Sequence, residues 1–159
     1  MSETIKEKVE LFDKKFPELT SAWDKATESF HKEFMNTYYD MLPIIDVMKK
    51  HSVYFTHPDL PDNIRSPHGP IIARNRFNAS EIFVLIDDVQ VCSVRAHDGE
   101  INEDERIMIL GDLVSRLDHK FAWKGLQSLH SRLDVVLSSE AECIAVLADL
   151  TTEIQRSRA

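Results

Sequence analysis

Apolar side chains recur every three or four residues through the first 41 positions, and this spacing constrains the fold more than any other feature of the chain. It predicts a first helix over Ile5–Phe16, with Thr4 and Glu7 at the spacing of a capping box and Pro17 ending it. A second helix is predicted from Pro17 until Pro43 bends or stops it. The apolar stripe of this second helix consists of Leu19, Trp23, Ala26, Phe30, Phe34, Tyr38 and Met41. We expect this stripe to face the core, because aromatic residues at helical spacing are usually packing residues.

The C-terminal third also has helical spacing. One predicted helix has apolar residues at Phe121, Leu126, Leu129, Leu133 and Val136. Ser139 and Glu142 have the spacing of a capping box for another helix. The apolar residues of that helix are Ile144, Leu147, Leu150 and Ile154. The last turn is basic, which suits the C-terminal end of a helix dipole.

Residues 52–78 interrupt the helical pattern. Prolines occur at positions 58, 61, 67 and 70, and no helix survives that density. An irregular connection of this length inside a compact domain is usually functional or mobile. If the chain binds a small ligand, we expect the site here. Its candidate residues are His57, His68, Arg74 and Arg76, since a histidine can transfer protons and arginines can hold a phosphate or carboxylate.

Segment 79–97 decides the fold class, and its sequence supports two interpretations. As one buried helix, it has apolar residues at helical spacing from Ile82 to Ala96. As two strands, 82–86 and 89–94, it has the β-branched content of a sheet. The turn would then be Asp87-Asp88, a poor two-residue hairpin connection compared with Asn-Gly or Asp-Gly. We therefore favour the helix, with a short hairpin at 82–95 as the alternative.

The next residues, 95–106 (RAHDGEINEDER), form a corner between two predicted helices. Gly99 can take the left-handed conformation that ends a helix. Asn102 and Glu105 have the spacing of a capping box that starts the next helix, whose inward face includes Ile107. Gly111 within that helix indicates the close approach of another helix.

The same corner contains half of a calcium-binding loop. With Gly99 at the sixth position of the loop, Asp98, Glu100 and Glu105 fall at ligand positions. The first two ligand positions, however, are Val94 and Ala96, which offer no carboxylate. An EF-hand of ordinary affinity is therefore not expected, because half of the ligand charge is missing.

The segment SVRAHDGEINEDERIMILGDLVSRL resembles the conserved pattern of the TerB-like tellurite-resistance family, with an apolar helix, an Ala-x-Asp-Gly turn and an acidic helix start. The resemblance covers residues 79–117. It implies an all-helical domain associated with metal-ion stress and membrane-linked complexes. In that domain Asp98, Glu100, Asp104 and Glu105 would form an acidic cluster for docking or metal contact. A weakly bound divalent cation is the only cofactor that the sequence suggests.

Charge and composition exclude several classes of function. Residues 79–118 carry ten acidic and three basic side chains, within a net charge of -8. Such a field repels phosphates, so direct binding to nucleic acid is not expected. The N-terminus lacks the basic start and apolar block of a secretory signal, and apolar runs such as Ile82–Ile86 are far below the ~20 residues of a membrane span. We expect a cytoplasmic protein.

These observations predict one mainly α domain over residues 1–159, a bundle-like arrangement of about six helices. Its parts are a helical segment 1–51, the irregular segment 52–78 and a helical segment 79–159. The predicted function is a helical protein-interaction or stress-sensing module with an acidic surface, which binds a protein partner or a second copy. One alternative is a small acidic inhibitor that binds a host protein by mimicking a polyanion. Another is a ligand- or nucleotide-binding protein, or an enzyme, that uses segment 52–78. Common catalytic motifs are absent, so no catalytic residue is assigned and an enzyme is not favoured.

Overall fold

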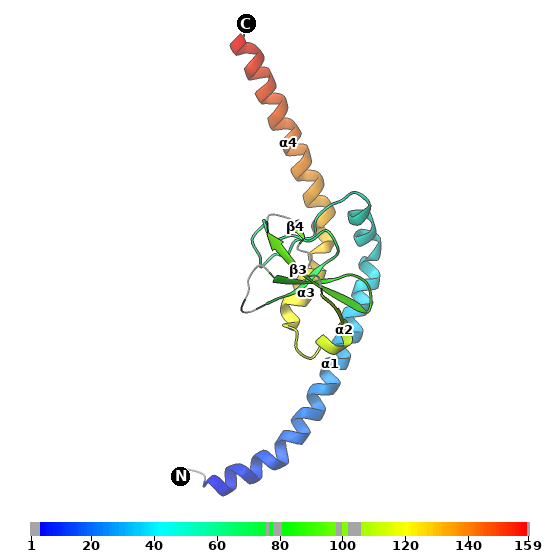
Figure 1. Cartoon of the computed structure of the whole chain (residues 1–159), viewed down its shortest axis with the longest axis vertical. Helices are drawn as coiled ribbons and strands as arrows, with labels where there is room; N and C mark the ends of the chain where they lie inside the picture. The colour runs from blue at the N-terminus through cyan, green and yellow to red at the C-terminus, as the bar shows by residue number, and fades with distance from the viewer. Residues whose placement is uncertain (1–3, 76, 78–80, 98–99, 102–105, 159) are drawn as a thin grey trace.

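The structure is a computed structural model that describes residues 4–75, 77, 81–97, 100–101 and 106–158. Its elements are α1 (Ile5–Lys50), β1 (Ile71–Arg74), β2 (Glu81–Leu85), β3 (Gln90–His97), β4 (Glu100–Ile101), β5 (Arg106–Ile109), α2 (Leu110–Leu113), α3 (His119–Gln127) and α4 (Leu129–Arg158). Parts of α1, α3 and α4 pack on an antiparallel sheet, and both long helices extend beyond it (Figure 1). The predicted mainly helical bundle is therefore wrong, and the α+β alternative describes this fold.

The long helix α1 begins at the predicted capping box. Thr4 Oγ1 accepts a hydrogen bond from Glu7 N, and the Glu7 carboxylate accepts one from Thr4 N, both at 3.2 Å. The helix continues through Pro17 and Pro43 to Lys50, so the predicted end at Pro17 is wrong. A proline removes one backbone hydrogen bond and crowds the preceding turn, which can kink a helix without ending it. Figure 1 shows that α1 is curved.

The sheet is an antiparallel meander. β2 pairs with β1 on one side and with β3 on the other, and β3 pairs in turn with β5 and, near its end, with β4. Ile82 lies opposite Val94, and Leu85 lies opposite Val91. The helix predicted over 79–97 is therefore wrong. Its β-branched residues favour the extended backbone, and pairing with neighbouring strands outweighs an apolar spacing that also fits a helix.

The connection between β2 and β3 shows how an Asp-Asp sequence can turn the chain. Ile86 N donates to Gln90 O at 3.0 Å, so the loop is longer than two residues. The Asp87 carboxylate closes the loop by accepting hydrogen bonds from Val89 N at 2.8 Å and Gln90 N at 2.7 Å. Aspartate commonly stabilises turns by bonding to the backbone two residues on. The objection to Asp-Asp holds for a two-residue turn and not for this longer one.

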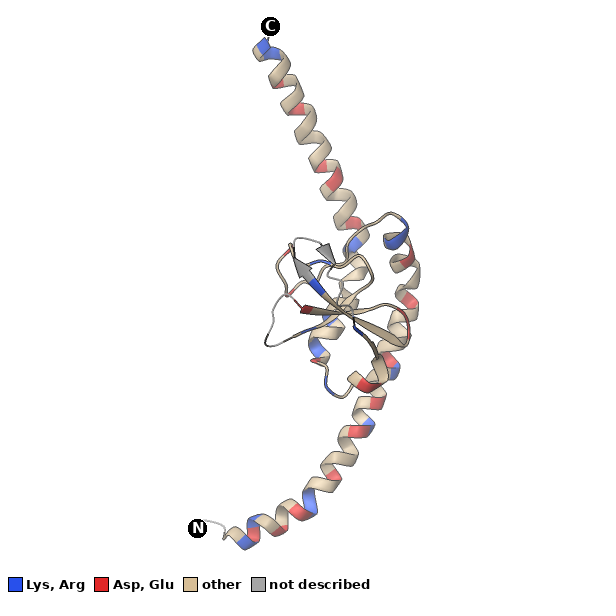
Figure 2. Ribbon diagram, viewed as in Figure 1, with Lys and Arg blue, Asp and Glu red and all other residues tan. Residues whose placement is uncertain are grey.

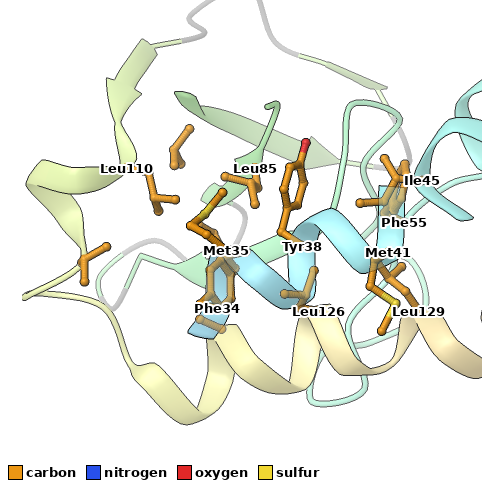
Figure 3. Packing of buried hydrophobic residues seen from close by; sticks show 14 of the residues in the cluster. Phe34, Met35, Tyr38, Met41, Ile45, Phe55, Leu85, Leu110, Leu126 and Leu129 are labelled. Carbon is orange, nitrogen blue, oxygen red and sulfur yellow. The ribbon is translucent and has the colours of Figure 1, made fainter. Parts of the chain in front are cut away.

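Alternation along the strands divides the core between the two faces of the sheet. On one face, Leu85 and Val91 pack against α1, α3 and the start of α4. Figure 3 shows Met35 and Tyr38 of α1 pointing from the helix toward the sheet at Leu85. The opposite face has a smaller cluster. Its buried members are Leu60, Ile71, Ile82, Val84, Cys92 and Val94.

Residues 52–70 are irregular, as predicted, but they are packed against the sheet. Phe55 and Ser66 pair in an isolated bridge, with N–H to oxygen distances of 2.7 and 2.9 Å, and both are fully buried. Leu60 belongs to the smaller core cluster. Segment 71–74, within the part predicted to be irregular, instead forms strand β1. Residues 52–70 therefore cover part of the sheet.

The segment after the acidic corner begins as a strand. Ile107, predicted to face inward from a helix, lies in β5 and is exposed. No described atom outside its own helix lies within 4 Å of the place where a Cβ on Gly111 would stand, so the close approach expected there is wrong. α4 runs without a break through Ser139 and Glu142, which therefore do not begin a separate helix.

Candidate functional site

The surface best suited to bind a partner lies on the N-terminal half of α1. Residues 5–23, here called the α1 arm, extend away from the sheet (Figure 1). Their apolar side chains are exposed: Ile5 by 83%, Leu19 by 65% and Trp23 by 51%. The α1 stripe, as we call this row, consists of Ile5, Val9, Phe12, Phe16, Leu19 and Trp23. An exposed apolar row of this size is typical of an interaction surface.

The apolar row of α1 continues past the α1 stripe, and it enters the core only where α1 reaches the rest of the protein. The rings of Trp23 and Phe30 both contact the His119 ring, with centroid distances of 5.8 and 4.7 Å. Burial begins at Phe34. The prediction that the row from Leu19 onward faces the core is therefore confirmed for its C-terminal half and wrong for the arm. Helical periodicity identifies an apolar face but does not say which chain covers it.

The α1 stripe has a seven-residue repeat. Its members are separated by four, three, four, three and four residues, which is the a and d pattern of a coiled coil. A helix that packs on the core of its own domain usually has a wider apolar face. Within the stripe, the rings of Phe12 and Phe16 stack at a centroid distance of 4.8 Å. The arm therefore presents a narrow seam that suits another helix.

The C-terminal part of α4, residues 134–158, forms a second arm at the opposite end of the molecule (Figure 1). Of the residues in α4, Leu129 alone is buried, and Leu133 packs partly on the core. The helix predicted through Ile154 does form, but its apolar face is exposed. The exposed apolar residues of this α4 arm are Val135, Leu137, Ile144, Val146, Leu147, Leu150 and Ile154.

Charged residues flank the apolar faces of both arms. The ribbon in Figure 2 shows basic and acidic residues interspersed along the α1 arm, and mainly acidic residues along the α4 arm until its basic tip. Lys15 and Glu18 lie 3.9 Å apart on the α1 arm, both exposed, and such a pair adds little stability. Within the described part of the chain, no helix has an apolar stretch long enough to cross a membrane. Both arms are thus amphipathic.

His57, a predicted ligand residue, belongs to the core. It is 2% exposed and stacks on the Phe121 ring at a centroid distance of 3.7 Å. Its Nδ1 accepts a hydrogen bond from Asp59 N at 3.0 Å, so Nε2 carries the proton and donates to Phe121 O at 2.7 Å. Burial lowers the pKa of His57, and the Phe121 carbonyl offsets only part of this effect. The neutral ring therefore joins the irregular segment to α3.

Arg74, a second predicted ligand residue, lies at a pocket of about 560 Å³. The pocket is also lined by Arg116, and its apolar lining includes Phe83 and Phe121. His57 does not line it, so the structure does not gather the predicted residues in one site. Two arginines beside aromatic side chains suit an anion that also has an apolar part, whereas Asp118, which lines the same pocket, opposes one.

The remaining predicted residues are dispersed or lie outside the description. His68 is partly buried, and its backbone N–H donates to Ser66 Oγ at 3.1 Å. Glu100 lies opposite His97 in the backbone register of β3 and β4. Among the residues that the structure describes, no group of three or more His, Cys, Asp or Glu side chains is placed to hold a metal ion. Outside the described residues lie Arg76, Asp98, Asp104 and Glu105.

Two signals in the sequence were open to a better interpretation. Residues 98–99 have the sequence Asp-Gly, a dipeptide that is favoured in two-residue hairpins. The predicted helix end rests on Gly99 alone. The strict seven-residue repeat of the α1 stripe is the second signal: it fits the predicted core spacing, but a repeat this narrow is also typical of a coiled coil.

Comparison with protein-family models, with curated proteins and with solved structures yields no match. The resemblance of residues 79–117 to the TerB-like family therefore stays a prediction. The all-helical domain that it implied is wrong, because this segment contains β2, β3, β4 and β5. The exposed apolar faces of the two arms are the features of the described structure that bear on its function.

Proposed function

We propose that this protein is a protein-interaction module that binds other polypeptide helices through its two arms. The observation that carries the proposal is the α1 stripe, in which all six apolar side chains are more than 50% exposed. Each large apolar side chain gains roughly 1.5–3 kcal/mol when it is fully buried. These side chains are 51–83% exposed, so the single chain leaves at least half of this gain unrealised, and a partner that covers the stripe is favoured.

The shape and charge of the arm favour a helix as the partner. The a and d repeat presents one narrow seam, which matches the face of a second amphipathic helix. A helix that lies on a membrane surface usually has a polar face rich in Lys and Arg. Residues 5–23 instead carry four lysines and four acidic residues. The polar side of the α1 arm therefore has no basic excess to attract anionic lipids.

The proposal does not rely on the acidic segment 79–118. Of its described acidic residues, Asp87 closes the β2–β3 loop and Asp88 accepts a hydrogen bond from the Tyr39 hydroxyl at 3.1 Å. These contacts are within the protein. A stress-sensing role, an inhibitor that mimics a polyanion, a divalent cation and a cytoplasmic location all stay predictions.

Position-specific photo-crosslinking tests the proposal. A benzoylphenylalanine at Phe12 should form a covalent adduct with a protein when the full-length chain is irradiated in its native cells. The matched control is the same group at Leu11, which is 50% exposed but lies outside the stripe. Leu19→Asp, combined with the group at Phe12, should remove the adduct by breaking the seam. Equal adduct yields at positions 11 and 12, or no adduct at position 12, would contradict the proposal.

A further inference from the structure

We infer that the partner of the α1 arm is the α1 arm of a second copy of this chain, in a parallel, in-register, two-stranded coiled coil. The inference rests on the proposed function and names its partner. It starts from the heptad positions, in which a residue at position a or d packs against the same residue of the other copy. Val9, Phe16 and Trp23 are at a, and Ile5, Phe12 and Leu19 are at d.

Charges beside the seam favour the parallel arrangement. Lys8 is at a g position, and Asp13 is at the e position of the following heptad. In a parallel, in-register pair, a g residue lies beside the following e residue of the other helix. Lys8 of each copy therefore lies beside Asp13 of the other copy, and the two-fold symmetry creates this contact twice.

The antiparallel arrangement that overlaps the same residues brings like charges together. There Ile5 faces Trp23 of the second copy, g positions lie beside g positions and e positions beside e positions. Lys15 then meets Lys15 of the other copy, and Asp13 meets Asp13. Because like charges at these positions oppose association, the charge pattern selects the parallel orientation.

The contacts at the base of the arm define where the seam ends. The next a residue after Trp23 is Phe30, whose ring contacts His119 of its own chain at a centroid distance of 4.7 Å. Phe30 is partly buried against its own chain and therefore lies outside the seam. Trp23 also contacts His119, but it is still 51% exposed and forms the last of the six layers that begin at Ile5. Pro17 is at a b position, so its ring lies on the outer side of the pair and not in the seam.

Sedimentation equilibrium of the full-length protein measures the association. We expect a dimer in the wild type and a dissociation constant raised at least about 100-fold by Phe12→Asp, since two buried rings are replaced by charges. The matched control is Leu11→Asp, which adds the same charge at an exposed position outside the seam and should change the constant less than about threefold. A wild type that stays monomeric, or a Leu11→Asp effect as large as that of Phe12→Asp, would overturn the inference.

A charge exchange tests the orientation. Lys8→Glu and Asp13→Lys should each raise the dissociation constant of the dimer about threefold to tenfold, because each places like charges at both symmetric contacts. The double variant should restore the wild-type dissociation constant, because the exchanged charges are again opposite at both contacts. In the antiparallel arrangement Asp13→Lys exchanges one like pair for another, so an absence of both the loss and the rescue would overturn the parallel orientation.

A disulfide trap supplies an independent measurement. In a Cys143→Ser background, Ile5→Cys should give a cross-linked dimer on mild oxidation, because the two new thiols face each other at a d position. The buried Cys92 remains as an internal control. In the antiparallel arrangement the two thiols are about 27 Å apart, the rise of 18 helical residues, and cannot bond. A monomer in solution together with Phe12 photo-adducts to another protein would refute the inference and leave the proposed function standing.

Discussion

At the scale of single residues, His57 is the side chain whose role the structure changes most. A histidine in a proline-rich polar segment suggests proton transfer, but this ring is buried against Phe121 and uses both nitrogens for backbone contacts. A neutral ring is required, because Nδ1 must accept from Asp59 N. Protonation would leave Nδ1 with a proton that points at another N–H group. The same contacts that anchor the segment make it sensitive to acid.

We predict that His57 makes the fold less stable below pH 6.5. Its pKa in the folded protein lies below the ordinary value of 6.5, mainly because the ring is buried. As pH falls below 6.5, the unfolded chain therefore binds a proton that the folded protein does not. The free energy of unfolding should decrease by up to about 1.4 kcal/mol per pH unit until the pKa of the folded state is reached. Above pH 6.5 the ring is neutral in both states and this effect vanishes.

Urea unfolding at pH 7.5, 6.5 and 5.5, at one fixed protein concentration, measures this effect in the wild type and in His57→Gln. Glutamine cannot titrate, so the variant should lose less stability between pH 6.5 and 5.5 than the wild type does. The other six histidines are present in both proteins and cancel in the comparison. An identical pH dependence in the two proteins would show that His57 is not held neutral.

At the scale of elements, the close packing of α3 on β1 depends on one glycine. A Cβ at Gly125 would overlap the Ile71 carbonyl oxygen and would stand 2.9 Å from His57 Cδ2. The Ile71 oxygen belongs to the backbone of β1, so it cannot move without shifting the strand. Gly125 therefore sets how closely the helix approaches the sheet edge and the His57 ring.

We predict that Gly125→Ala destabilises the protein by about 1–3 kcal/mol, since overpacking forces backbone shifts of this cost. Gly111→Ala is the matched control, because Gly111 also lies in a helix but has open space where the methyl group would go. There alanine should be neutral or stabilise by up to about 1 kcal/mol through its higher helix propensity. Chemical denaturation measures both changes, and equal stability of the two variants would contradict the close approach of α3 to β1.

At the scale of the whole molecule, stability is unevenly distributed. The α1 arm buries no side chain in its own chain, while the second half of α1 supplies Phe34, Tyr38 and Met41 to the core (Figure 3). A helix without tertiary packing is only marginally stable in water, because most helical stability in proteins comes from an apolar face that is covered. One continuous helix therefore contains a stable half and a half that needs a partner.

Hydrogen exchange should reveal this division. We predict that amides of residues 5–23 exchange faster than those of residues 34–48, and that their protection rises with protein concentration as the arms pair. Phe12→Asp should abolish that concentration dependence and leave residues 34–48 unchanged. Arm protection that is independent of concentration in the wild type would show that the arm is stable without a partner.

Features that depend only on neighbouring residues could be predicted before the structure was known. The predicted capping box at Thr4 and the basic end of the last helix both form. Of the segment 52–78 predicted to be irregular, residues 52–70 are irregular. Each arises from interactions over a few positions along the chain, such as a side chain that bonds a nearby N–H or a proline that blocks a helix. The existence of an apolar face on α1 was predictable for the same reason.

What covers each apolar face depends on contacts between distant segments, which local spacing does not show. The residues from Ile82 to Val94 fit a helix or two strands, and the choice depends on pairing with β1 and β5, which lie outside that segment. The burial of His57 depends on Phe121, 64 positions away. Likewise, Leu19 and Phe34 belong to one apolar row of one helix, and only the placement of the sheet leaves the first exposed and buries the second. Burial is decided by contacts between distant segments, and local spacing carries no information about them.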